Sequence, residues 1–152
     1  MRILVDADAC PTKEIVERTA QEYKIPLYFF IDTSHVLSVK YGEVITVSQG
    51  ADAVDFALIN FLLKGDIVVT QDYGVAAMAL GKGSFAIHQS GKVFTNENID
   101  QMLFERHLSK VQRRASKKFH GKGPKKRSQE DDIRFEEAFR RLILQILGEE
   151  AK

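Results

Sequence analysis

Short apolar runs alternate with helix-like segments along the first 88 residues, and this alternation restricts the fold more than any other feature. β-branched and aromatic residues predict strands at residues 2–6, 27–31, 43–47, 67–70 and 85–88. Helices are expected at residues 11–23, 52–63 and 73–80. Strands that are apolar throughout are typically covered on both faces. The pattern therefore predicts an α/β protein, a three-layer α/β/α sandwich with a mostly parallel central sheet.

The second half of the chain is predicted to form a turn and two helices. A turn at residues 90–95 precedes a helix over residues 98–118, and the residues GKGP at 121–124 break it. Ser128 and Asp131 form a capping-box pattern at the start of a final helix over residues 128–148. The apolar stripe of this helix needs a partner surface, so we expect one domain over residues 1–152 with the helix packed on it. The stripe consists of Phe135, Phe139, Leu142, Ile143, Ile146 and Leu147.

Positive charge is concentrated in one segment. The net charge is only +1, but residues 105–127 hold ten Lys and Arg against one acid, whereas the rest holds twelve against twenty. This basic segment is thus +9 and the remainder −8. Such an arrangement is expected if the body binds cations and the segment meets a polyanion, although solubility alone also explains it.

Membrane and exported proteins are disfavoured by the sequence. The longest apolar stretch, residues 56–63, is interrupted by Asn60 and falls short of the roughly 20 residues of a membrane span. The first residues lack the pattern of a signal peptide, and the single cysteine, Cys10, suits a reducing compartment. We therefore expect a cytoplasmic protein with no membrane partner.

Aspartates stand where predicted strands lead into predicted helices. Asp6 and Asp8 end the first strand, Asp52 and Asp55 open the helix after the third, and Asp72 follows the fourth. In a parallel sheet these junctions all lie at one edge, where open α/β folds bind ligands. The five carboxylates should therefore converge.

Each aspartate alone has a structural explanation, because Asp is a favoured N-cap residue. Together they would repel one another by roughly 4 kcal/mol per close pair at an effective dielectric of about 20, which a bound cation would relieve. Oxygen ligands without a nearby cluster of cysteine or histidine favour Mg²⁺ or Mn²⁺ over Zn²⁺. Such an ion usually completes its shell with water and substrate phosphates, so we expect phosphoryl or phosphodiester hydrolysis by a metal-activated water.

Three segments carry a family resemblance. They are ILVDADACP, SQGADAVDFALINFLLKGDIVVTQDYGVAAMAL and GKGPKKRSQEDDIRFEEAFRRL. Together they resemble the YaiI/YqxD family of bacterial proteins, which is grouped with the PIN-like nucleases. The resemblance spans nearly the whole chain and implies a PIN-like sandwich that cuts RNA with Mg²⁺ or Mn²⁺. By this resemblance the metal ligands are Asp6, Asp52 or Asp55, and Asp72. From the convergence of the acids we expect a catalytic group that consists of Asp6, Asp8, Asp52, Asp55 and Asp72.

The basic segment is the predicted contact for a nucleic acid, RNA in preference to DNA. It mixes aromatic and histidine side chains with its positive charges, which suits binding of a phosphate backbone. A solvated helix face followed by a loop would explain the same charges. The residues expected to touch substrate are Arg106, Lys110, Arg113, Arg114, Lys117, Lys118 and Lys122.

Three functions remain open at this stage. The leading hypothesis is a metal-dependent nuclease that hydrolyses phosphodiester bonds. An alternative is a non-catalytic RNA-binding protein with a degenerate nuclease core. Another is a phosphatase similar to the haloacid dehalogenases, because the DADAC run offers Asp6 as a nucleophile. A nucleophilic Cys10 is disfavoured because neighbouring carboxylates raise a thiol pKa. The sequence leaves the oligomeric state open.

Overall fold

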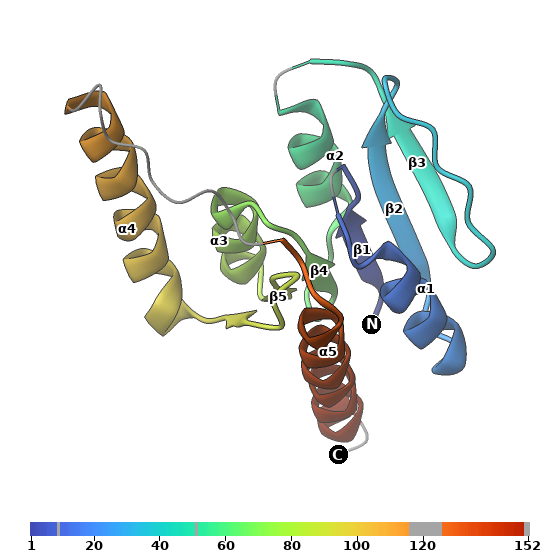
Figure 1. Cartoon of the computed structure of the whole chain (residues 1–152). Coiled ribbons are helices and arrows are strands. Elements are labelled where there is room, and N and C mark those ends of the chain that lie inside the picture. The colour runs from blue at the N-terminus through green and yellow to red at the C-terminus, as the bar shows by residue number, and fades with distance from the viewer. Residues whose placement is uncertain (9, 51, 116–125, 151–152) are drawn as a thin grey trace.

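A six-stranded sheet forms the centre of the computed structural model, which describes residues 1–8, 10–50, 52–115 and 126–150 (Figure 1). The strand order is β3-β2-β1-β4-β5-β6, and every neighbouring pair is parallel except β5 with β6. The predicted mostly parallel sheet is therefore confirmed. The strands are β1 (Ile3–Asp6), β2 (Leu27–Asp32), β3 (Glu43–Val47), β4 (Ile67–Val69), β5 (Phe85–Ile87) and β6 (Val93–Phe94).

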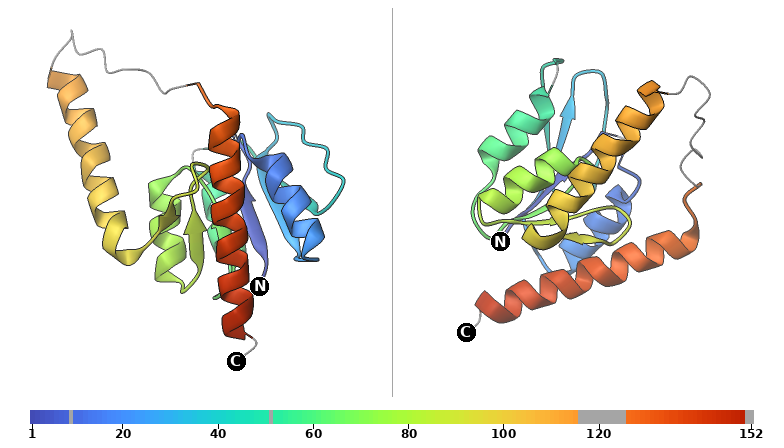
Figure 2. Two further views of the ribbon diagram at one scale, coloured as in Figure 1. Left: turned by 60° about the horizontal axis from the view of Figure 1, so that its bottom comes forward. Right: turned by 90° about the vertical axis from the view of Figure 1, so that its left-hand side faces the viewer.

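Helices cover both faces of the sheet. One face is covered by α1 (Lys13–Glu22) and α5 (Gln129–Glu150). The other is covered by α2 (Ala53–Phe61) and α3 (Tyr73–Gly81), with α4 (Asn96–Ala115) packed outside α3. The right-hand view of Figure 2 shows α5 below the sheet and α2, α3 and α4 above it. The predicted three-layer α/β/α architecture is confirmed.

The two cores follow from the alternation of side chains along each strand. Ile3 and Val5 point to the core under α1 and α5, whereas Leu4 between them points to the core under α2 and α3. All three side chains are fully buried, so the strands have to be apolar throughout. Phe135 and Phe139 of α5 stack in the first core with ring centroids 5.3 Å apart, so the apolar side of α5 packs on the sheet of the same chain.

Two predictions about secondary structure were wrong in detail. Residues 90–95 are not only a turn, because Val93–Phe94 forms β6, which pairs antiparallel with β5. The fourth helix begins at Asn96, two residues earlier than expected. Its start is set by Thr95 and Asn98, since each backbone N–H donates to the other's side-chain oxygen, at 2.9 and 3.1 Å. Residues 116–118 of the predicted helix and the GKGP break lie outside the described residues.

The edge where the parallel strands begin is tied together by Arg2 and Asp66. Asp66 is almost fully buried and accepts hydrogen bonds from the Arg2 guanidinium, the Arg2 backbone N–H and the Leu63 backbone N–H, at 2.7–3.1 Å. The Arg2 guanidinium also lies 4.4 Å from the centre of the Phe61 ring. This carboxylate is therefore a structural acid, remote from the strand ends that carry the predicted site.

Among the described residues, no helix combines the length and the apolar character that crossing a bilayer requires. Cys10 is buried and unpaired, at 3.3 Å from the Thr12 hydroxyl. Burial raises the pKa of its thiol, in keeping with the expectation that it is not a nucleophile.

Candidate functional site

Carboxylates from the ends of two parallel strands and from one helix meet at the upper edge of the sheet in Figure 1. Asp6 is the last residue of β1, and Asp8 follows two residues later. Asp72 follows β4 and begins α3, while Asp55 lies in the first turn of α2. The predicted convergence is visible in their electrostatics, because the charges of Asp8, Asp55 and Asp72 all raise the pKa of Asp6.

Asp6 is the most perturbed of these acids. Partial burial is the main reason that its pKa rises from 3.8 to about 6, and the charges of its acidic neighbours add to the rise. The Thr70 hydroxyl opposes this rise by donating a 3.1 Å hydrogen bond to Asp6 Oδ2. Thr70 Oγ1 in turn accepts a 3.0 Å hydrogen bond from the Asp72 backbone N–H. Thr70 thus connects β1 to the start of α3.

Asp55 and Asp52 complete the acidic group from α2. Partial burial raises the pKa of Asp55, and the charges of Asp72, Asp52 and Asp8 add to the rise. Asp52 is exposed and has a left-handed backbone, with φ of 63°. The five predicted acids therefore form one electrostatically coupled group, although Asp52 and Asp55 do not line the cleft described below.

Helix capping explains only one of the five acids. Asp72 caps α3, with Oδ1 accepting hydrogen bonds from the Gly74 and Val75 backbone N–H groups at 2.8 and 3.1 Å. Asp52 stands at the N-cap position of α2, but its side chain makes no cap hydrogen bond. Asp8 does not cap α1, because the N-cap position there is occupied by Thr12. The remaining acids need another reason to be close together.

A cleft of about 610 Å³ opens beside these acids. Asp6, Asp8 and Asp72 line one side of it, and α4 lines the other with Arg106 and neighbouring side chains. The Arg106 guanidinium lies 5.9 Å from the centre of the Tyr73 ring, which itself packs edge-on against Phe94. The other lining residues are Gln71, Met102, Glu105 and Ser109. The cleft thus places a fixed positive charge and an aromatic ring beside the carboxylates.

Only part of the predicted substrate-binding segment can be placed. Arg106 lines the cleft, as expected for a contact to substrate, and Lys110 is exposed one turn further along α4. Arg113 and Arg114 belong to α4, but their side chains are not described. The remaining predicted contacts, Lys117, Lys118 and Lys122, lie outside the described residues.

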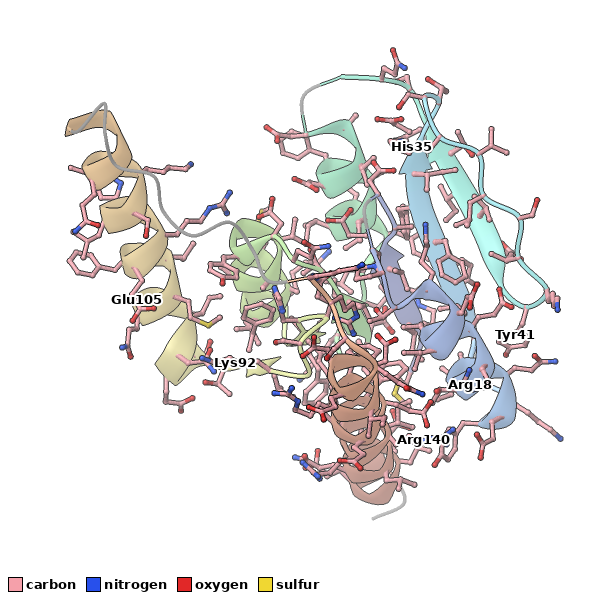
Figure 3. The ribbon with its side chains drawn as sticks, viewed as in Figure 1. Arg18, His35, Tyr41, Lys92, Glu105 and Arg140 are labelled. Atoms are coloured by element: carbon pink, nitrogen blue, oxygen red, sulfur yellow. The ribbon has the colours of Figure 1, made fainter. Side chains whose placement is uncertain are left out.

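Sequence reasoning missed Asp32 and His35 at the end of β2. His35 Nδ1 lies 3.1 Å from Asp32 Oδ1 and 3.2 Å from Asp8 Oδ1, and one donor atom of each residue falls within 4.8 Å of the others. Hydrogen bonds from Ser34 and His35 lower the pKa of Asp32. Figure 3 shows His35 beside the end of β2. Asp32 is the last residue of β2 just as Asp6 is the last residue of β1, so the same rule of strand ends would have found it.

The donor atoms at this edge suit a hard divalent cation. Asp8 Oδ1 is buried and accepts no hydrogen bond of good geometry from any described residue, although His35 Nδ1 lies 3.2 Å away. A buried carboxylate oxygen without such a bond is costly unless a cation or another donor satisfies it. Carboxylate oxygens suit Mg²⁺ or Mn²⁺. Among the described residues, the group of three whose donor atoms lie close enough to share an ion is Asp8, Asp32 and His35, which adds an imidazole nitrogen to two carboxylates.

Comparison with known proteins places the chain among bacterial relatives. Residues 4–145 match the family described as "Uncharacterized BCR, YaiI/YqxD family". A UPF0178 protein of Clostridium acetobutylicum is 65% identical over 144 residues, covering 95% of this chain and 97% of the relative. A UPF0178 protein of Lachnoclostridium phytofermentans is 59% identical over 147 residues, covering 96% and 99%. No solved structure matches the chain.

Proposed function

This chain belongs to the YaiI/YqxD family, and we propose that it is a metal-dependent nuclease that hydrolyses phosphodiester bonds in RNA. The observation that carries the proposal is the coupled group of carboxylates beside a cleft whose opposite wall presents Arg106. The carboxylates would hold a cation that also coordinates a phosphate oxygen of the substrate, and the arginine on the opposite wall would bind the same phosphate. We propose the cytoplasm as its place of action, as the sequence predicts.

Asp6 and Asp72 are the proposed principal ligands for Mg²⁺ or Mn²⁺, with Asp8, Asp52 and Asp55 completing the negative field. Asp72 is held rigidly because Oδ1 is engaged in capping α3. Asp6 is held by Thr70. When bound, the ion supplies an activated water and stabilises charge on the phosphorus oxygens.

The chain's own residues position the substrate in this scheme. The Arg106 guanidinium donates to a phosphate oxygen, and the Tyr73 ring offers a face on which a base can stack. Tyr73 is fixed by Phe94 and by His88, with ring centroids 5.7 and 6.3 Å away. Stacking needs an unpaired base, so the proposed substrate is single-stranded.

Nuclease assays with Mn²⁺ on labelled RNA test the proposal, together with Mn²⁺ binding measured by calorimetry. Asp6→Asn and Asp72→Asn each remove a charge while keeping the shape of the side chain. Asp72→Asn preserves the start of α3, because asparagine is as good an N-cap residue as aspartate. Both variants are expected to lose cleavage at least a hundredfold and to bind Mn²⁺ at least tenfold more weakly, by roughly the factors that lost metal-site interactions cost.

Glu43→Gln is the matched control, because Glu43 is an exposed acid at the start of β3, on the opposite edge of the sheet. It should leave cleavage and Mn²⁺ binding unchanged. RNA binding without cleavage or metal uptake would favour the non-catalytic alternative. Cleavage that survives equally in Asp6→Asn would indicate a contaminating enzyme and would reject Asp6 as a ligand.

A further inference from the structure

The ends of β1 and β2 bring two carboxylates and an imidazole together. The register of the two strands pairs Asp6 with Phe30. Asp8 and Asp32, each two residues further along, therefore stand at neighbouring strand ends. The backbone N–H of His35 donates a 3.2 Å hydrogen bond to the Asp32 carbonyl, and this turn brings the imidazole against both carboxylates (Figure 3).

The donor atoms of this group are spaced as ligands of one ion. His35 Nδ1 lies 3.1 Å from Asp32 Oδ1 and 3.2 Å from Asp8 Oδ1, and one donor atom of each residue lies within 4.8 Å of the others. Neighbouring ligand atoms that each lie about 2.1 Å from a zinc ion are themselves roughly 3.0–3.4 Å apart. Small movements of the side chains are therefore enough for all three to bind one ion.

Hydrogen bonding leaves one of these donors unsatisfied. Three oxygen atoms surround His35 Nδ1 at 3.0–3.2 Å, namely Ser34 Oγ, Asp32 Oδ1 and Asp8 Oδ1. The nitrogen carries at most one hydrogen, so it cannot donate to all three. Asp32 Oδ1 also accepts a 2.8 Å hydrogen bond from the Ser34 backbone N–H. Asp8 Oδ1 is buried and accepts no hydrogen bond of good geometry from any residue that the structure describes, so a cation beside the imidazole would satisfy it.

We propose that Asp8, Asp32 and His35 form a second metal site, which binds a divalent transition metal with Zn²⁺ as the best fit. Imidazole is a preferred ligand of zinc, whereas Mg²⁺ prefers oxygen ligands alone. Three protein ligands leave a coordination position for water, as in zinc sites that keep an open position. The imidazole is 52% exposed, so solvent reaches this position.

The strand order separates this zinc site from the proposed Mg²⁺ or Mn²⁺ site. β1 lies between β2 and β4 in the sheet, so Asp32 and Asp72 lie on opposite sides of β1. The Asp6 carboxylate is hydrogen-bonded to Thr70, on the β4 side. Asp32 and His35 do not line the cleft, and Asp8 borders both sites. The zinc site therefore does not rest on the proposed nuclease activity.

Calorimetric titration of the metal-free full chain with Zn²⁺ tests the site, with millimolar Mg²⁺ present to fill the all-oxygen site. The wild type is expected to bind one Zn²⁺. His35→Ala and Asp32→Asn each remove a ligand and should bind Zn²⁺ at least tenfold more weakly, because lost metal-site interactions cost roughly ten- to a hundredfold. The two side chains are 52% and 25% exposed, so the variants should keep the wild-type circular dichroism spectrum. His35→Asp replaces the imidazole with a carboxylate and should lower the preference for Zn²⁺ over Mn²⁺, which loss of the fold would not do.

Two controls place the ion. His107→Ala, a matched change at an exposed histidine of α4, should bind Zn²⁺ as the wild type does. Asp72→Asn should also retain Zn²⁺, because Asp72 belongs to the other site. A wild type that takes up no Zn²⁺, or equal affinities of the wild type and His35→Ala, overturns the proposal. Zinc binding that is lost in Asp72→Asn and retained in Asp32→Asn overturns it as well. No RNA is present, so the result does not depend on whether the chain cleaves RNA.

Discussion

The Asp6 carboxylate works against folding when it is ionised. Its pKa in the folded chain is about 6, raised from 3.8 by burial and by neighbouring acids. The folded state therefore binds the proton more tightly than the unfolded state. This contribution to stability is fully present below pH 3.8 and is lost as the pH rises through about 6. The loss amounts to roughly 3 kcal/mol at most.

Removing the negative charge of Asp6 should stabilise the metal-free protein at neutral pH. Asp6→Asn keeps an oxygen that can accept the Thr70 hydrogen bond but carries no charge. We expect its free energy of unfolding to exceed that of the wild type by about 1–3 kcal/mol at roughly pH 8, and by less at about pH 5. Urea denaturation with a chelator present measures the difference. A variant less stable than the wild type at the higher pH would contradict the assignment of a raised pKa to Asp6.

For Asp66, a different buried acid, we expect that removing the carboxylate lowers the free energy of unfolding. Its carboxylate is paired with Arg2 and accepts backbone hydrogen bonds, so Asp66→Ala leaves a partly buried guanidinium without its partner. We expect a loss of about 3–5 kcal/mol in the free energy of unfolding, measured by urea denaturation. Arg18→Ala breaks an exposed ion pair with Glu136 and should cost less than about 1 kcal/mol. Equal costs for the two variants would contradict the structural role of Asp66.

The difference between these acids shows what a sequence reveals about a site. Asp6, Asp8 and Asp72 are predictable because they follow apolar runs whose ends must share one edge of a parallel sheet. Asp66 precedes such a run, so the same rule correctly leaves it out of the site. Asp32 also lies at the end of a strand, but the polar residues after it have the composition of a turn, so from the sequence it is interpreted as part of that turn and not as a site residue. The contact of His35 with Asp8 depends on the path of a loop, which no periodicity encodes.

The helix α5 contributes to stability mainly by packing. Phe139 is fully buried in the core that α1 and α5 form with the sheet. We expect Phe139→Ala to cost about 3–5 kcal/mol in the free energy of unfolding, because it removes a large buried ring and leaves a cavity. Leu144→Ala, on the exposed side of the same helix, should change stability by less than about 0.5 kcal/mol. Thermal and urea denaturation provide the measurement, and similar costs at both positions would argue against this docking.

Elements with a clear period were predictable, and short ones were not. The stripe of α5 repeats along the helix, so its docking face could be named from the sequence. β6 has only two residues, too few to show alternation, and exists because Val93 and Phe94 pair with β5. The start of α4 depends on reciprocal hydrogen bonds between Thr95 and Asn98, which lie outside any hydrophobic pattern.

At the scale of the whole molecule, the layers followed from the sequence but the cleft did not. Continuous apolar strands require helices on both faces of the sheet. Which helices lie on which face depends on how each connection crosses the sheet, and in this chain α1 and α5 lie opposite α2 and α3. The cleft depends on where α4 lies relative to α3, and this is set by packing around Ile99 and Met102. That packing places Arg106 in the same cleft as Asp6, Asp8 and Asp72.

The separation of charge between body and basic segment leads to a prediction for RNA binding. If the basic segment neutralises phosphates, affinity for a single-stranded RNA should fall linearly on a logarithmic plot against salt concentration. Fluorescence anisotropy in EDTA, which prevents cleavage, measures this slope. Arg106→Gln removes one phosphate contact and should reduce the slope by about 0.7. Lys64→Gln, at the opposite edge of the sheet, should leave it unchanged. Affinity that is insensitive to salt would mean that RNA is not held by this segment, whatever the carboxylates bind.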